Sequence, residues 1–433
     1  MRSVNIGLIG AGTIGGGVID LIDRNGKLIF DRTGIKLFLK KVCDKDTKRL
    51  ATFKSLKKSQ FTSDHREILN DKDIDIVIEL IGGINPAKEM VLKALGAGKH
   101  VVTANKALLS DSWDEIFDTA LKNKVFVNFE ASVGGAIPII RCLKESFVTN
   151  NLELVYGILN GTTNFILTMM DECGYSFDEA LKIAQSKGIA EKNPALDISG
   201  GDSAQKLAII LILGFGVKVS PKDIFTEGIE NITPLDIQYA KNWGYVIKLL
   251  AIAKRKAKEL QLRVHPALIP GHHLLSGVKG EDNAVFVRGD FIGDSLLYGK
   301  GAGSWPTASS VVSDVVDIAK HVVSHGERSP ATHILRTRRE SFTFHEHDSF
   351  DIPYYLRFSV IDKPGVLAKI STILARNNIS IERMYQEVRK EGQSVPLVML
   401  THNAVEGNMK KAISEIDKID VVTDKTVVIR IEE

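Results

Sequence analysis

Cysteine is scarce in this sequence. Cys43, Cys142 and Cys173 are the only three in 433 residues, and none forms a C-x-x-C pair. A small, odd number of cysteines argues against a disulfide framework and against a zinc site. It favours a reducing compartment, so we expect a cytoplasmic protein.

Excess charge and long apolar runs are also missing. The formal net charge is only +3, which is too small to indicate nucleic acid or a membrane surface as a partner. The longest apolar runs fall far short of the roughly 18 residues that a membrane span needs. The first four residues lead directly into a strand, which leaves no room for a signal peptide. The 44% hydrophobic share is that of an ordinary globular chain long enough for two to four domains.

Glycine, by contrast, is concentrated near the N-terminus. The apolar strand 4–9 is followed at once by Gly10-Ala-Gly12-Thr13-Ile14-Gly15 and then by a helix. This is the G-x-G-x-x-G pattern in the setting that dinucleotide binding requires. Its first glycine permits the tight turn, its second lets a pyrophosphate approach the backbone, and its third lets the helix pack on the strand. The predicted cofactor-binding residues here are Gly10, Gly12, Thr13, Ile14 and Gly15.

The end of the second strand, 35–42, leaves the choice of nucleotide open. Asp44 is placed to accept a hydrogen bond from a ribose 2′-hydroxyl, which favours NAD. Lys45, with Lys48 and Arg49 behind it, is equally placed to receive the 2′-phosphate of NADP. We therefore expect NADP or NAD.

Strands and helices continue to alternate after this loop. Apolar strands at 73–79 and 100–103 flank a helix at 86–96. This alternation predicts an α/β fold whose first domain, 1–145, is a Rossmann-type, doubly wound parallel sheet. Lys106 follows the strand 100–103, at the edge where ligands bind in such sheets, and it is as compatible with a substrate contact as with a surface position.

Acidic residues gather in the stretch 188–206. Glu191, Asp197 and Asp202 precede Lys206, and the apolar run 207–215 follows directly. A helix that starts near Asp202 places Asp202 and Lys206 one turn apart on the same face. The alternative is a solvated ion pair at a helix end, but an ion pair next to nine apolar residues is harder to keep in water.

Four segments together resemble homoserine dehydrogenases. They are Thr103-Ala-Asn-Lys106, Glu130-Ala-Ser-Val-Gly-Gly-Ala-Ile-Pro138, Asn160-Gly-Thr-Thr-Asn164 and the stretch 188–206. The resemblance covers about residues 1–320 and implies NAD(P)-dependent reduction of L-aspartate 4-semialdehyde to L-homoserine. It also implies an α+β substrate-binding and dimerisation domain at 146–300, a return of 301–325 to the nucleotide domain, and a homodimer or homotetramer.

The resemblance implies a role for each matched residue. Lys206 corresponds to the acid–base lysine and Lys106 to a second lysine that orients the substrate and contacts the cofactor. The implied substrate-binding residues are Glu191, Asp197, Asp202 and Thr162, although Thr162 suits ordinary helix capping almost as well. The implied further cofactor contacts are Gly188 and Gly303. The implied ligands of a monovalent cation, usually sodium, are Glu130, Val133, Gly135 and Ile137.

The last hundred residues differ in pattern. The polar segment 326–350 is typical of a linker. After it, 351–433 alternates as βαββαβ, and Asp362-Lys-Pro-Gly365-Val-Leu resembles the turn of ACT domains, which bind amino acids, typically between paired copies. An end-product effector such as L-threonine is implied. The alternative is a dimerisation module that binds nothing.

Two other functions remain to be weighed. Aspartate-semialdehyde dehydrogenase shares the substrate but needs an acylating cysteine beside a base, and neither Cys142 nor Cys173 has that setting. A non-enzymatic amino-acid sensor would use the nucleotide fold only as scaffold. It would bind NADPH without oxidising it when aspartate semialdehyde is added.

Overall fold

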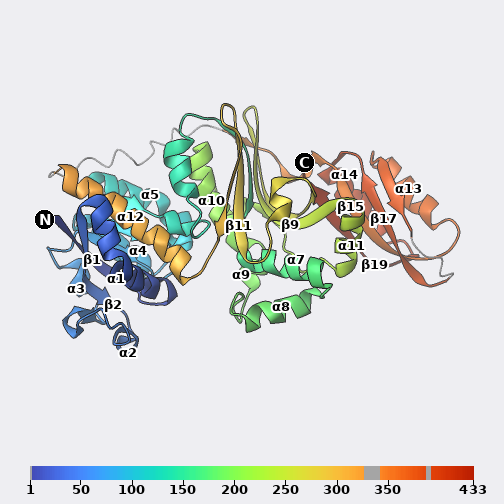
Figure 1. The fold of residues 1–433 in the computed structure, drawn as a ribbon. Coiled ribbons are helices and arrows are strands. Elements are labelled where there is room, and N and C mark those ends of the chain that lie inside the picture. The colour runs from blue at the N-terminus through green and yellow to red at the C-terminus, as the bar shows by residue number, and fades with distance from the viewer. Residues whose placement is uncertain (1, 326–341, 387–391) are drawn as a thin grey trace.

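The computed structural model describes residues 2–325, 342–386 and 392–433. The chain forms three bodies in a row, with the N-terminal domain at one end and the C-terminal domain at the other (Figure 1). Within these described residues, no helix combines the length and the apolarity needed to cross a membrane.

The N-terminal sheet is fully parallel, with strand order β3-β2-β1-β4-β5-β6. This is the doubly wound order that the alternation of strands and helices predicted, and the order reverses between β1 and β4, where such folds bind dinucleotides. The strands are β1 (Arg2–Ile9), β2 (Ile35–Cys43), β3 (Phe61–Thr62), β4 (Ile76–Glu79), β5 (His100–Thr103) and β6 (Val127–Asn128).

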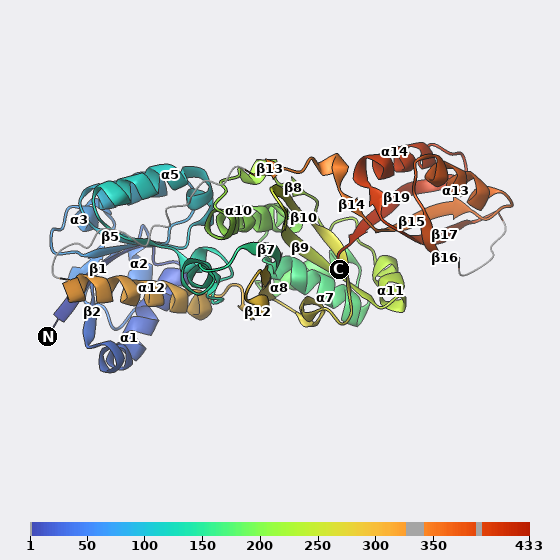
Figure 2. The ribbon, with the colours of Figure 1, turned by 90° about the horizontal axis from the view of Figure 1, so that it is seen from above.

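Helices cover both faces of this sheet. α1 (Thr13–Thr33) and α12 (Ser304–His325) pack together over one face, with Val18 and Val315 in the same apolar cluster as Ile6. α4 (Ala87–Gly96) and α5 (Lys106–Lys122) cover the other face. The segment after residue 300 therefore returns from the middle of the molecule to the N-terminal sheet, and Figure 2 shows α12 beside α1.

The middle body is built on antiparallel strands in the order β12-β11-β7-β9-β10. These are β7 (Leu152–Ile158), β9 (Tyr245–Lys256), β10 (Glu259–Pro270), β11 (Asp282–Gly289) and β12 (Gly293–Lys300). β9 shows no alternation in sequence because its residues 247–253 are buried on both faces. One face carries α7 (Gly161–Cys173), α10 (Gly201–Phe215) and α11 (Pro234–Asn242), while α8 (Phe177–Ser186) packs on α7.

The C-terminal body has the predicted βαββαβ pattern. Its strands lie in the antiparallel order β19-β15-β17-β16, and Gly365, at φ +90°, begins the first helix. The elements are β15 (Tyr354–Ile361), α13 (Val366–Arg376), β16 (Ile381–Tyr385), β17 (Ser394–Thr401), α14 (Glu406–Ile416) and β19 (Val422–Ile431).

The C-terminal sheet is continuous with the middle sheet. β19 pairs in parallel with β10 through Ala267 opposite Arg430 and Leu268 opposite Ile431, so the two form one sheet of eleven strands. β13 (Thr343–Phe344), from the segment expected to be a linker, pairs with the same edge of β10. An exposed strand edge is a template for pairing, and two residues are too short a strand to show a period in sequence. Residues 326–341 of that segment lie outside the described part of the chain.

Buried ion pairs join these two bodies. Arg263 of β10 donates to Glu432 at 2.5 Å, and Tyr156 of β7 donates to the same carboxylate at 3.0 Å. On α11, Asp236 accepts hydrogen bonds from Tyr355 at 2.9 Å and from Arg357 at 2.6 Å. The C-terminal body is therefore fixed to the middle one by desolvated charges as well as by strand pairing.

Candidate active site

Asp202 lies at the centre of the site. Gly200 adopts φ +86° and ends the preceding loop, so that α10 begins at Gly201 and Asp202 falls in its first turn. The Asp202 side chain is 4% exposed, and its two oxygens accept from Lys206 Nζ at 2.8 Å and from Lys106 Nζ at 2.9 Å. Lys106 is the first residue of α5, in the nucleotide domain, whereas Lys206 is on α10 of the middle body. The structure thus brings the two predicted lysines to one carboxylate from separate domains.

The charges of this cluster stabilise one another. Burial by itself would raise the pKa of Asp202, but the ammonium groups of Lys206 and Lys106 outweigh it and hold that pKa well below its usual range. Burial likewise acts to lower the pKa of Lys106, and the nearby carboxylates, Asp202 first, more than offset it, so that the pKa is raised. Asp202 is therefore a carboxylate and Lys106 an ammonium at neutral pH.

Asn160 connects Asp202 to the other predicted substrate residues. Its side-chain amide donates to Asp197 at 2.8 Å and to Asp202 at 2.9 Å. The hydroxyl of Thr162 lies 3.0 Å from Asp197 Oδ2 and 3.1 Å from the Ile189 carbonyl. α7 begins at Gly161, and its cap is Asn160, which accepts from the Thr163 N–H. Asn160 belongs to a recognised motif but was not predicted as a site residue.

The remaining predicted substrate residue, Glu191, is solvent-exposed in the loop after α8. It lies close enough to Lys106 for its charge to favour the ammonium form of that lysine. Gly188, at φ +71°, is in the same loop, and its neighbour Ile189 accepts from Thr162. The structure places both on the middle-body side of the cluster.

A buried carboxylate, Glu79, joins the carboxyl ends of β4 and β5, the strand that precedes Lys106. Glu79, at the end of β4, accepts from Thr103 at 2.7 Å and from the Ile81 N–H at 2.9 Å. Asn105 caps α5 and donates to the Gly83 carbonyl at 2.6 Å. These bonds fix the carboxyl ends of β4 and β5, and α5 begins with Lys106 just after β5. In the sequence, these bonds correspond to the polar residues Glu79 and Thr103, each of which ends an apolar strand.

The glycine loop has the shape that a dinucleotide requires. Gly10 has φ +97°, and a Cβ on Gly15 would lie 2.0 Å from the Gly10 carbonyl oxygen, so neither position accepts a side chain. A Cβ on Gly12 would meet nothing nearer than 3.9 Å, which leaves its backbone open to a ligand. α1 has no side-chain cap, so the N–H groups around Thr13 and Ile14 are free to receive a phosphate. Gly303, at φ +111°, precedes Ser304, whose hydroxyl donates to the Thr13 carbonyl at 2.6 Å.

The residues that bear on the choice of nucleotide lie at the end of β2. Asp44 already accepts from the Ala11 N–H at 2.7 Å and from the Asp46 N–H at 2.9 Å. Lys45, Lys48 and Arg49 are exposed, and the Arg49 guanidinium is the nearest group to the open side of Gly12. One cation, Arg49, therefore lies beside the open side of Gly12, while the Asp44 carboxylate holds the loop.

The segment expected to bind a cation forms a tight loop. Gly134 and Gly135 adopt φ +71° and +58°, and a Cβ on Gly135 would lie 2.5 Å from the Gly301 carbonyl oxygen. The Glu130 carboxylate accepts from the N–H groups of Ile140 at 2.9 Å and Arg141 at 2.8 Å. The Gly135 carbonyl accepts from Ser310 at 2.8 Å, and the Ile137 carbonyl accepts from the Ile139 N–H at 2.8 Å.

A second buried carboxyl lies beside Glu130. Asp314 of α12 accepts from the Glu130 N–H at 2.7 Å. Burial, together with the neighbouring Glu130, raises the pKa of Asp314 to about 8, and burial also raises the pKa of Glu130. Arg141 is the nearest guanidinium, 3.7 Å from Asp314. Asp314 is inside a helix, with no local sequence signal for a site.

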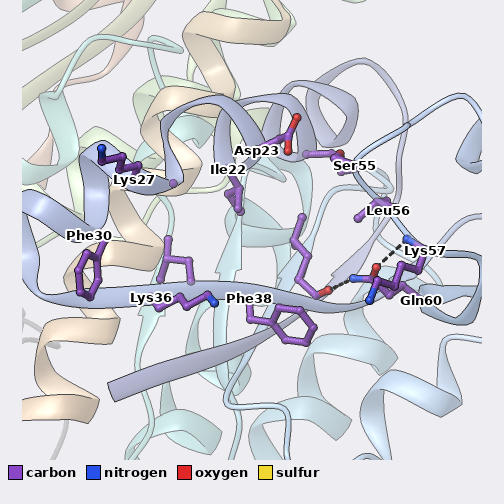
Figure 3. A pocket seen from close by; sticks show the side chains of 14 residues that line it. Ile22, Asp23, Lys27, Phe30, Lys36, Phe38, Ser55, Leu56, Lys57 and Gln60 are labelled. Carbon is purple, nitrogen blue, oxygen red and sulfur yellow. Dashed lines mark hydrogen bonds between the residues drawn. The ribbon is translucent and has the colours of Figure 1, made fainter. Parts of the chain in front are cut away.

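A separate hollow of about 480 Å³ lies on the outer side of the nucleotide domain (Figure 3). It is bounded by the second half of α1 and the first half of β2, with Phe30, Phe38, Lys36 and Lys57 among its lining residues. Nucleotides bind beyond the carboxyl ends of parallel strands, and this hollow lies at the opposite end of β2. It is therefore not part of the cofactor site.

Three regions of the chain match family models. Residues 10–130 match the homoserine dehydrogenase NAD-binding domain, 138–316 match homoserine dehydrogenase, and 354–421 match the ACT domain. A homoserine dehydrogenase of Neisseria gonorrhoeae is 41% identical over 433 residues, which is 100% of this chain and 99% of that protein. One from Pseudomonas aeruginosa is 39% identical, with full coverage of both chains.

Solved structures of homoserine dehydrogenases also match this chain. The crystal structure of a homoserine dehydrogenase from Thiobacillus denitrificans has a TM-score of 0.93 and 41% identity, covering 100% of this chain and 99% of that one. A hyperthermophilic archaeal homoserine dehydrogenase in complex with NADPH has a TM-score of 0.62 and 26% identity over 73% of this chain and 98% of that one.

Proposed function

Since this chain belongs to the homoserine dehydrogenase family of NAD(P)-dependent oxidoreductases, we propose that Lys206 and Lys106 carry out the proton chemistry of its reaction, the reduction of L-aspartate 4-semialdehyde to L-homoserine. The observation that supports this assignment is the convergence of the two ammonium groups, from separate domains, on the buried carboxylate of Asp202. The glycine loop follows β1 and Lys106 follows β5, so both stand at the carboxyl edge of the parallel sheet, where such folds bind dinucleotides.

Lys206 is the proton donor in this proposal. When bound, the nicotinamide supplies the hydride to the aldehyde carbon, and the new alkoxide oxygen must then receive one proton. An ammonium has three donors, and Lys206 uses two of them, on Asp202 and on the Leu159 carbonyl at 2.6 Å. The third remains for the substrate oxygen. Lys106, one-third exposed and held by Asp202, orients the aldehyde and stabilises the developing oxyanion.

The acidic residues around the lysines receive the other end of the substrate. Aspartate semialdehyde carries an ammonium group, and Asp197 and Glu191 are the carboxylates of this site that no lysine holds by a direct ion pair within the described chain. Thr162 fixes Asp197 by its hydroxyl. A cationic ligand thus gives these carboxylates a partner.

The assay that tests the function is oxidation of NADPH and NADH by the purified chain with L-aspartate 4-semialdehyde. Activity with a linear dependence on enzyme concentration supports the proposal. Binding of NADPH without oxidation would instead indicate a sensor in which the nucleotide fold is only scaffold.

We also propose that NADP is preferred over NAD, because the Arg49 guanidinium lies beside the open side of Gly12, with the exposed Lys45 and Lys48 in the same segment, while Asp44 already holds the loop through two backbone N–H groups. Replacing Arg49 by alanine is expected to raise KM for NADPH by about 10-fold or more, the scale of a charge-assisted hydrogen bond, with a smaller change for NADH. Lys54→Ala, an exposed lysine five residues further on, is the matched control. Equal changes for both nucleotides in Arg49→Ala would contradict the assignment.

A sodium ion in the loop formed by Glu130, Val133, Gly135 and Ile137 is the next part of the proposal. One carboxylate and three backbone carbonyls are the hard oxygen donors that such a cation takes, and a carbonyl oxygen with one hydrogen bond retains a second lone pair. Burial raises the pKa of both Glu130 and Asp314, and Arg141, 3.7 Å from Asp314, does not offset it, so a bound cation would favour their ionised forms. The ion would fix the loop and take no part in the chemistry.

Sodium is expected to raise the melting temperature by a few degrees relative to a large organic cation at equal ionic strength. A Glu130→Gln variant should lose most of this difference. An identical melting temperature in both salts for the parent protein would remove the ion from the proposal.

The C-terminal domain is proposed to bind an amino-acid effector, L-threonine in the first instance, between paired copies of a homodimer or homotetramer. Its support is the match to the ACT family and the Gly365 turn. Activity of the full chain with and without L-threonine, alongside sedimentation analysis, tests it. No inhibition and no thermal shift would favour a dimerisation module that binds nothing.

The domain limits that accompany these roles are 1–145 with 301–325 for the nucleotide, 146–300 for the substrate, and 351–433 for regulation. We further propose a cytoplasmic enzyme, since the three cysteines are free thiols.

A further inference from the structure

A cavity of about 320 Å³ lies between α7 and α11, away from the Asp202 cluster. Thr168 and Asp171 of α7 and Lys241 of α11 line two of its walls. β9 forms its floor, and the loop that follows β10 closes it with Ser276, Gly277 and Lys279 among its residues. Neither the proposed chemistry nor the ACT-domain effector uses this space.

Lys248 of β9 is the unusual residue of this cavity. It is 3% exposed, and within the described chain its ammonium donates to two neutral oxygens, Asn164 Oδ1 at 3.1 Å and the Val278 carbonyl. Among the described residues, no carboxylate comes within salt-bridge distance of it. Buried charges are normally paired, because an isolated one loses its hydration without compensation.

The carboxylates near the cavity are already matched to other lysines. Asp171 pairs with Lys241 at 3.4 Å, and Glu172 pairs with Lys279 at 2.7 Å. The opposite charges within each of these pairs compensate one another, whereas the charge of Lys248 has no such partner among the described residues. Burial lowers the pKa of Lys248 to about 8, so the side chain is still mostly an ammonium at neutral pH.

We propose that this cavity binds a small α-amino acid, whose carboxylate is the counter-ion of Lys248 and whose ammonium meets Asp171. Two of the three donors of Lys248 are engaged, so one is left for the ligand. The volume suits a ligand of amino-acid size. Lys241 contacts one oxygen of Asp171 at 3.4 Å, which leaves acceptor positions on that carboxylate for the ammonium of the ligand. This site is separate from the proposed effector site of the C-terminal domain.

A ligand in this cavity would contact α7, which leads to the active site, and α11, which contacts the C-terminal domain. α7 starts at the cap Asn160, which holds Asp202, and Asn164 of the same helix is the partner of Lys248. α11 carries Asp236, which Tyr355 and Arg357 of the C-terminal domain bind. An amino acid in the cavity therefore contacts both the helix behind the active site and the helix that the regulatory domain contacts.

Titration calorimetry of the full chain with L-alanine tests the proposal. Lys248→Met removes the charge and keeps an apolar side chain of similar length. Gly277→Leu adds a bulky side chain to a residue that lines the cavity and leaves Lys248 untouched, and a Cβ at Gly277 meets nothing within 4 Å, so the backbone accepts the change. Each variant is expected to weaken binding by about 10-fold or more, the scale of one charge-assisted contact. Lys254→Met, an exposed lysine on the same strand, is the matched control and should bind as the parent does.

Two further readouts sharpen the result. Acetate should bind more weakly than L-alanine because it lacks the ammonium that meets Asp171. Affinity for L-alanine should fall about 10-fold between pH 7 and pH 9, as Lys248 loses its proton in the presence of Asp171, Glu172, Lys241, Lys279 and Tyr245.

Absence of L-alanine binding to the parent, or parental affinity in either Lys248→Met or Gly277→Leu, overturns the proposal. Equal affinity for acetate and L-alanine overturns the assignment to an amino acid. The Gly277→Leu arm keeps the test decisive if Lys248→Met does not fold.

Discussion

Replacing Lys206 by alanine is expected to lower kcat by at least about 100-fold, the usual scale for loss of a positioned general acid. The same loss is expected for Lys106→Ala, because the oxyanion then forms without its nearby ammonium. Both variants should fold, since Asp202 keeps one lysine and Asn160 as partners in each. Steady-state rates with saturating NADPH and aspartate semialdehyde provide the measurement.

Arginine substitutions separate the two roles. Arginine keeps the positive charge beside Asp202 but does not give up a proton at any pH of interest. Lys206→Arg should therefore be nearly as inactive as Lys206→Ala, and small primary amines should partly rescue the alanine variant. Lys106→Arg should retain much more activity, because orientation and charge are what Lys106 provides.

Lys192→Ala is the matched control, an exposed lysine in the loop between Glu191 and α10. It should leave kcat within about twofold of the parent, as surface substitutions usually do. If kcat of both alanine variants stayed close to that of Lys192→Ala, the two ammonium groups would have no part in the chemistry.

The parts of this site that local sequence patterns carry were predictable. The glycine loop and the turn that starts α10 are encoded by residues within a few positions of one another, and so is the one-turn spacing of Asp202 and Lys206. Lys106 was placed at a strand end by alternation alone. Its meeting with Asp202 follows from domain packing, which no local pattern contains.

The parts that depend on distant contacts were not predictable. β9 is buried on both faces and so lacks a period of two, and β13 is too short to have one. Nothing in the local sequence distinguishes Asp314 and Lys248 from ordinary charged residues of a helix and a strand, and only the folded chain shows that they are buried. The joining of β19 to β10 couples residues more than 160 positions apart and turns an expected separate domain into a continuation of the middle sheet.

That joining leads to the largest expected effect on stability. Replacing Glu432 by alanine leaves Arg263, which is fully buried, without a carboxylate partner. Removing one member of a buried ion pair costs about 3–5 kcal/mol, because the remaining charge stays desolvated. The Tyr156 hydroxyl would lose its acceptor on Glu432 in the same variant. Denaturant unfolding of the full chain should show a clear drop in the midpoint.

Glu433→Ala is the matched control, because Glu433 is the exposed neighbour at the end of the chain. The double variant Arg263→Met with Glu432→Leu should recover most of the loss, since a buried ion pair can often be replaced by apolar side chains of similar size without cost. A midpoint for Glu432→Ala equal to that of Glu433→Ala would show that the pair does not hold the two bodies together. If the midpoint falls in Glu432→Ala but recovers in the double variant, the loss of stability comes from the unpaired buried charge of Arg263. Strand pairing and apolar packing would then suffice to keep the C-terminal domain in place.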